Sequence, residues 1–75
     1  MKDQINSPKH YPQGKIEVID FVEDQQMDFN LGNAVKYLAR HRFKGRPLED
    51  LKKARWYVDR LIANEEKREV ANAGN

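Results

Sequence analysis

Apolar residues recur in this chain at the three- and four-residue spacing of amphipathic α-helices. In the middle of the chain, one face of such a helix is formed by Leu31, Ala34, Val35 and Leu38. We expect this helix to run from about residue 31 to residue 42. Asp28 or Asn30 is suited to cap its start, and Gly45 is suited to the C′ position at its end.

The same spacing predicts one helix on either side of the middle one. The first runs from about residue 15 or 16 to residue 27; its frequent β-branched residues leave a strand over 16–22 as an alternative. The other runs from 47 to about 64, with Pro47 at its first position. The core stripe that we expect on this last helix is Leu48, Leu51, Ala54, Val58, Leu61 and Ile62.

The two ends of the chain lack this pattern. Pro8, Pro12 and Gly14 argue against a helix in residues 1–15, which we expect to form an extended arm. Residues 65–75 become charged and then small and polar, so we expect them to fray or to be disordered. The sequence therefore predicts an all-α fold, with a compact three-helix domain over residues 16–64.

Composition narrows the class of protein. A chain of 75 residues has a thin core, which favours assembly into a homo-oligomer, either a dimer or a tetramer. It contains no cysteine, no apolar run long enough to span a membrane and no signal peptide, so we expect a cytoplasmic protein without a membrane partner. A net charge of +2 argues against nucleic acid as the main partner.

A second stripe on the middle helix carries polar chemistry. Its members, which repeat the helical spacing opposite the apolar face, are Asn33, Lys36, Tyr37 and Arg40. An ammonium and a guanidinium suit a phosphate, and a phenol ring suits a base, so this stripe could bind a phosphorylated ligand that contains a ring. The alternative is a solvated face with one amphipathic tyrosine.

Further cations follow this stripe. Residues 36–46 contain five basic residues and no acidic one, and Lys44 and Lys53 could join Lys36 and Arg40 around a phosphate. The alternative is a solvated turn whose cations favour the C-terminal end of a helix. On the arm, His10 and Tyr11 could close over a bound base, or Tyr11 could pack its ring against the helices.

Trp56 lies opposite the expected core stripe of the last helix. We expect it to contact another subunit of the oligomer, because tryptophan is enriched at the centres of interfaces; stacking on a base is the alternative.

Catalytic features are few. Glu17, Asp20 and Asp24 fall on one side of the first helix, where they could hold Mg²⁺, pair with cations or face solvent. Ser7 is the only serine, and threonine, cysteine and a phosphate-binding glycine loop are absent. We therefore predict no catalytic residue, no metal site and no cofactor.

Several segments taken together resemble a known family. They are His10-Tyr11, 16–21, 32–40, Lys44-Gly45 and 48–57. They are similar to small phage proteins of unassigned function, often labelled nucleotide kinases because a larger podophage nucleoside-monophosphate kinase contains a similar segment. The chain also resembles phage sponge proteins of the anti-CBASS type, which sequester cyclic nucleotide signals of bacterial immune systems.

The resemblance implies a phage protein that acts in the cytoplasm of an infected bacterium. It would sequester a cyclic dinucleotide or cyclic oligonucleotide without catalysis and so suppress antiviral defence. The ligand-binding residues that it implies are His10, Tyr11, Asn33, Lys36, Tyr37, Arg40, Lys44 and Lys53. A nucleoside-monophosphate kinase is the first alternative, which would need Mg²⁺ and two nucleotide sites, and a small DNA-binding domain is the second.

Overall fold

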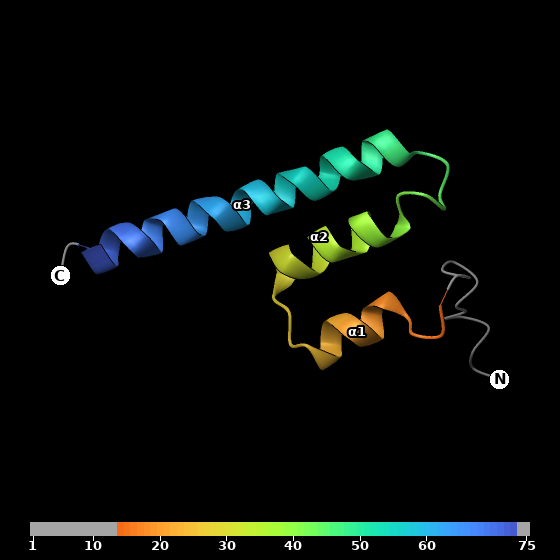
Figure 1. Ribbon diagram of the computed structural model, residues 1–75, viewed down its shortest axis with the longest axis horizontal. Helices are drawn as coiled ribbons and strands as arrows, with labels where there is room; N and C mark the ends of the chain where they lie inside the picture. The colour runs from red at the N-terminus through yellow and green to blue at the C-terminus, as the bar shows by residue number, and fades with distance from the viewer. Residues whose placement is uncertain (1–13, 74–75) are drawn as a thin grey trace.

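The computed structural model describes residues 14–73, and these form three α-helices without a strand. The helices are α1 (Val18–Asp24), α2 (Phe29–Arg40) and α3 (Pro47–Ala73). Figure 1 shows α2 lying antiparallel to the first part of α3, with α1 on the other side of α2. The predicted all-α class and its three helices are confirmed. The expected arm lies outside the described residues, apart from residues 14 and 15.

Two helix starts follow the sequence signals. The Asp28 carboxylate Oδ1 accepts a hydrogen bond from the Leu31 backbone N–H at 2.8 Å, so Asp28 is the cap of α2. Pro47 opens α3, where its missing N–H leaves no helical hydrogen bond unmade. The start at Pro47 was predicted; for α2, Asp28 was one of two predicted caps, and the helix begins two residues before the expected residue 31.

Two helix ends differ from expectation. α1 ends at Asp24 and not at the expected residue 27, because Gln26 adopts a left-handed φ of 54° that the helix cannot continue through. Gly45 has a φ of 84°, but it lies well past His41, the C-cap of α2. Gly45 therefore shapes the turn between α2 and α3 and is not the C′ residue that the sequence predicted.

α3 continues through residues 65–73, where we expected a frayed tail. Residues 48–73 contain neither proline nor glycine and are rich in good helix formers. An ion pair of 2.7 Å between Arg68 Nη1 and Glu65 Oε2, three residues apart, adds to the helix. This last segment of α3 is exposed along its whole length and extends beyond the end of α2 (Figure 1).

The core is very small. Among residues 14–73, the buried apolar side chains are Ala34 and Ala54, and the buried polar one is Asp50. The expected apolar stripes supply the two buried alanines, but their large side chains are not the core: Leu31 and Leu38 of α2 are exposed. So are Leu48, Leu51, Val58 and Ile62 of α3. The face of α3 with the least exposure is instead Asp50, Ala54, Tyr57, Leu61 and Asn64.

α1 packs closely on α2 at one glycine. A Cβ built on Gly32 would lie 3.1 Å from Val22 Cγ1, which is tighter than an ordinary contact. Gly32 thus lets the two helices approach. No helix within residues 14–73 is long and apolar enough to cross a membrane.

Candidate ligand-binding face

The polar stripe of α2 packs against α3. The Tyr37 ring stacks on the Tyr57 ring, with centroids 6.1 Å apart and planes 13° apart. The Phe29 ring also contacts Tyr57, edge-on, with centroids 6.0 Å apart. Aromatic rings bury more area than Ala34 and Leu38 can, and pairs of rings attract beyond that area. This explains why α2 turns Tyr37, and not Leu31 or Leu38, toward α3.

An ion pair fixes the other end of this helix pair. Arg40 Nε lies 3.2 Å from Asp50 Oδ2, and Arg40 Nη2 donates to Asp50 Oδ1 at 3.3 Å. The Asp50 side chain is 3% exposed and the Arg40 side chain 26% exposed. The two-pronged geometry suits a guanidinium and a carboxylate. Arg40 therefore joins α2 to α3, and only part of it faces solvent.

Three cations surround the Tyr37 ring. Lys36 Nζ lies 4.6 Å from the ring centroid, Arg40 Cζ 4.8 Å and Lys53 Nζ 5.4 Å. Each distance is within the range of a cation–π contact. Positive charge from both helices is thus concentrated on one half-buried aromatic ring.

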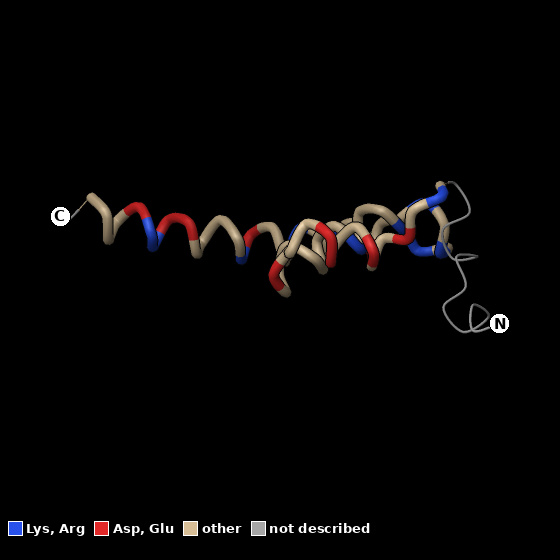
Figure 2. Tube along the Cα trace, turned by 90° about the horizontal axis from the view of Figure 1, so that it is seen from below, with Lys and Arg blue, Asp and Glu red and all other residues tan. Residues whose placement is uncertain are grey.

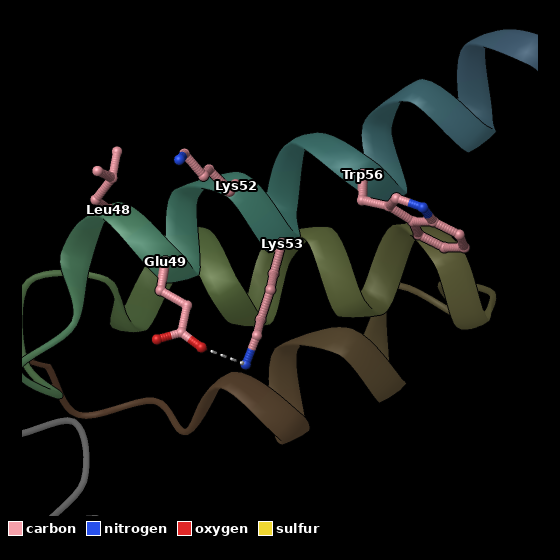
Figure 3. A pocket seen from close by; sticks show the side chains of 5 residues that line it. All are labelled: Leu48, Glu49, Lys52, Lys53 and Trp56. Carbon is pink, nitrogen blue, oxygen red and sulfur yellow. Dashed lines mark ion pairs between the residues drawn. The ribbon is translucent and has the colours of Figure 1, made fainter.

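Lys53 also belongs to a shallow open groove on α3. The groove has a volume of about 590 Å³ and is lined by Leu48, Glu49, Lys52, Lys53 and Trp56. Figure 3 shows Lys53 and Glu49 pointing to the α2 side of the helix, Leu48 and Lys52 pointing away from α2, and the indole one turn further along. The Trp56 side chain is 59% exposed, and its ring meets the Tyr57 ring edge-on at 5.0 Å.

A second carboxylate, besides the Asp50 that pairs with Arg40, offsets part of this positive charge. Glu49 Oε2 lies 3.7 Å from Lys53 Nζ, and Glu49 Oε1 accepts a hydrogen bond of 2.9 Å from Arg46. That hydrogen bond, followed by the Arg46 charge, lowers the pKa of Glu49 below its ordinary value. Glu49 is therefore ionised at neutral pH and holds Lys53 at the edge of the groove.

We define the ligand-binding face by the residues that these contacts join, namely Lys36, Tyr37, Arg40, Lys52, Lys53, Trp56 and Tyr57. It unites four of the predicted ligand-binding residues, Lys36, Tyr37, Arg40 and Lys53. Sequence analysis missed Lys52 and Tyr57. Tyr57 lies four residues after Lys53, one helical turn away, and that spacing was the available signal.

The other predicted residues are not brought to this face by any contact in the described part of the chain. The Asn33 side-chain amide donates to the Phe29 carbonyl at 2.9 Å, within its own helix. Lys44 is exposed in the turn after α2. His10 and Tyr11 lie outside the described residues. Within residues 14–73, no three acidic or histidine side chains gather as metal ligands, and this includes Glu17, Asp20 and Asp24.

Fold and face together define a class: a small three-helix protein with clustered cations and aromatic rings on one surface. A model of the family described as "Protein of unknown function (DUF3310)" matches residues 5–59, and the chain belongs to this family. The matched region contains the whole ligand-binding face. Neither a curated protein nor a solved structure gives a match.

Proposed function

We propose that this protein binds a nucleotide on the ligand-binding face and holds it without converting it. The observation that carries the proposal is the position of Lys53. Its ammonium lies 5.4 Å from the Tyr37 centroid, and its side chain also lines the groove beside Trp56. One lysine thus connects a cluster of cations with an exposed aromatic platform.

The two parts of this face match the two parts of a nucleotide. The Trp56 indole offers an exposed surface on which a base can stack, and its edge-on contact with Tyr57 limits its movement. Lys52 and Lys53 line the same groove as the indole, and Lys36 supplies a third ammonium at Tyr37. Ammonium groups bind phosphate as point charges and tolerate different phosphate geometries.

A phosphate has to compete with Glu49 for Lys53. The Glu49–Lys53 pair is exposed and its atoms are 3.7 Å apart, so it is weak. A phosphate carries more charge than one carboxylate and can also reach Lys52. We therefore infer that a bound nucleotide replaces Glu49 as the partner of Lys53.

Binding without turnover agrees with the reactive groups that the chain contains. It has one serine, Ser7, and neither threonine nor cysteine to act as a nucleophile. The resemblance to phage sponge proteins extends the proposal to the ligand, a cyclic dinucleotide or cyclic oligonucleotide of a bacterial immune system. In that setting, the protein lowers the free concentration of the signal in the infected cell.

The test is a calorimetric titration with mononucleotides, ADP-ribose derivatives, and cyclic di- and trinucleotides. Each mixture is then heat-denatured, and the released nucleotide is identified by chromatography. We expect saturable binding of at least one cyclic nucleotide and its recovery intact. No binding across the panel, or recovery of a converted nucleotide, would contradict the proposal.

Two lysine variants locate the site. Lys53→Ala removes a charge-assisted contact, which should weaken binding by about tenfold or more. Lys67→Ala removes the same charge from the exposed last part of α3, away from the face, and should leave the affinity unchanged. Equal affinities for the two variants would place the ligand elsewhere on the protein.

A further inference from the structure

We infer that a second copy of this chain packs on the side of the α2–α3 pair opposite the ligand-binding face, with the two α3 helices antiparallel. This inference is independent of the nature of the ligand. It rests on a stripe of exposed residues along α3, called the seam below, on the near symmetry of that seam and on the distribution of charge along the molecule.

The seam is a second heptad-like stripe on α3. Its members, spaced alternately three and four residues apart, are Leu48, Leu51, Arg55, Val58 and Ile62. All are exposed, Leu48 by 64% and Ile62 by 49%. The alternation is that of residues which meet a partner helix in a coiled coil. α2 occupies a different stripe, the one that contains Asp50, Ala54 and Tyr57.

Most of the seam lies away from Lys53, and Leu48, which also lines the groove, is at the border between the seam and the ligand-binding face. Residues advance by about 100° round a helix, which puts Leu51, Val58 and Ile62 about 140–180° from Lys53. On α2, Leu31 and Leu38 likewise lie about 140–160° from Lys36.

Lys36 and Lys53 lie on the same side of the helix pair, because both ammonium groups contact the Tyr37 ring. Leu31 and Leu38 of α2 therefore share the opposite side with Leu51, Val58 and Ile62 of α3. They form one apolar surface across both helices.

The near symmetry of the seam favours a second copy over an unrelated protein. A twofold axis close to Arg55 sets Leu48 opposite Ile62 of the partner copy, and Leu51 opposite Val58 of the partner copy. An interface of this type needs the same patch on both subunits, and the seam supplies it. Arg55 is long enough to extend its charge to solvent, and Asp59 of the partner copy comes within about one turn of it.

Charge along the molecule favours the antiparallel orientation. The turn between α2 and α3 carries Arg42, Lys44 and Arg46, at one end of the molecule (Figure 2). The last part of α3, at the other end, carries Glu65, Glu66 and Glu69 among two cations. Antiparallel pairing about Arg55 sets these carboxylates beside the basic turn of the partner copy. A parallel pair would instead set like ends together.

The same arrangement completes the burial that one chain lacks. Within residues 14–73, the buried apolar side chains are two alanines, which together bury little area. Residues 65–73 extend past α2 without a neighbour and are too few to be stable as an isolated helix. A second copy covers the seam and supports this extension.

The first test measures the mass in solution by light scattering. We expect the wild-type chain to have at least twice its mass of 8.8 kDa. Val58→Glu places a charge in the seam and should yield the monomer mass, with helicity checked by circular dichroism. Val70→Glu is the matched control: Val70 is 72% exposed and lies on another side of α3, so its variant should keep the wild-type mass. A monomeric wild-type chain, or an unchanged mass for Val58→Glu, would overturn the inference.

Trp56→Ala separates this interface from the subunit contact through Trp56 that the sequence predicts. The seam leaves Trp56 outside the interface, so the mass should stay at the wild-type value. A fall to the monomer mass would overturn the inference in favour of the Trp56 side.

Single cysteines test the orientation, because the natural chain has none. In the antiparallel pair, the two copies of residue 55 are close, whereas the two copies of residue 62 are about 20 Å apart along the helix. Under oxidation, Arg55→Cys should therefore form disulfide-linked dimers and Ile62→Cys should not. Efficient linkage through residue 62 would overturn the antiparallel arrangement.

Discussion

Tyr37 serves both the packing of the helices and the proposed binding of a nucleotide. One side of its ring stacks on Tyr57, which joins α2 to α3. Three cations surround the same ring, which concentrates positive charge at the helix contact. The cations gain cation–π attraction there, which offsets part of their mutual repulsion. The free energy that holds α2 on α3 thus also positions the groups proposed to bind phosphate.

At the same scale, Asp50→Asn should lower the free energy of unfolding by about 1.5–3 kcal/mol, measured by urea denaturation. The substitution keeps the shape of a side chain that is 3% exposed but removes the charge facing Arg40. Glu49→Gln is the control, because its pairs are exposed, and it should leave the unfolding midpoint nearly unchanged. Equal effects of the two variants would mean that the Arg40–Asp50 pair does not hold α2 to α3.

The lowered pKa of Glu49 gives a prediction about pH. Its hydrogen bond from Arg46 is charge-assisted only when the carboxylate is ionised, so the full interaction is present above the unfolded-state pKa of glutamate. It is lost as the pH falls through the lower folded-state pKa. A titration followed by NMR should find Glu49 below the ordinary glutamate range, and Arg46→Ala should raise its pKa. An unchanged pKa in Arg46→Ala would exclude the hydrogen bond as the cause.

At the scale of elements, the contacts of α2 with its two neighbours do not use the leucines of its apolar stripe. It meets α3 through Tyr37 and Arg40, and α1 through Gly32. Leu31 and Leu38 are left exposed and contribute to the surface proposed for a second copy. One side of α2 therefore contacts α3, another contacts α1, and a third contributes to the surface proposed for a second copy.

The close approach at Gly32 is testable with a double-mutant cycle. Gly32→Ala removes a flexible residue from a helix, which alone would stabilise by about 1 kcal/mol. Because the new Cβ would lie 3.1 Å from Val22 Cγ1, we expect this gain to vanish in the wild-type background. In a Val22→Ala background, Gly32→Ala should stabilise by about 0.5–1 kcal/mol against thermal or urea unfolding. A full gain in the wild-type background would show that Val22 yields freely.

Local signals were enough to predict the helices, and long-range contacts decided the rest. Asp28 fixes the start of α2 through its side-chain carboxylate, and Pro47 begins α3 without an N–H to satisfy. Both signals depend on residue type alone, so the sequence shows them directly. The side of α2 that faces α3 depends on Tyr57 and Asp50, which are distant in sequence. Apolar periodicity therefore predicted the buried Ala34 and Ala54 but wrongly placed the leucines beside them in the core. The contacts of α2 with Tyr57 and Asp50 also bring Lys53 of α3 close to Lys36 and Tyr37 of α2. Residue spacing within one helix cannot show that residues of two different helices meet.

At the scale of the whole molecule, the α2–α3 pair presents two chemically different sides. One carries Lys36, Lys53 and Trp56, and the other carries exposed leucine, valine and isoleucine. Pairing through the apolar side would leave Lys36, Lys53 and Tyr37 of both copies on the outside of a dimer, with Leu48 at the border between the interface and the groove. The predicted oligomer and the proposed nucleotide binding are thus compatible in one assembly with two equivalent sites.

The most direct test of the proposed site uses the fluorescence of Trp56, the single tryptophan of the chain. During titration with the nucleotide that binds in calorimetry, we expect a saturable change in Trp56 emission with the same dissociation constant. Lys53→Ala should shift this curve to at least about tenfold higher nucleotide concentration, whereas Lys67→Ala should not. Calorimetric binding without any change in Trp56 emission would contradict the account, because the ligand would then be bound away from the indole.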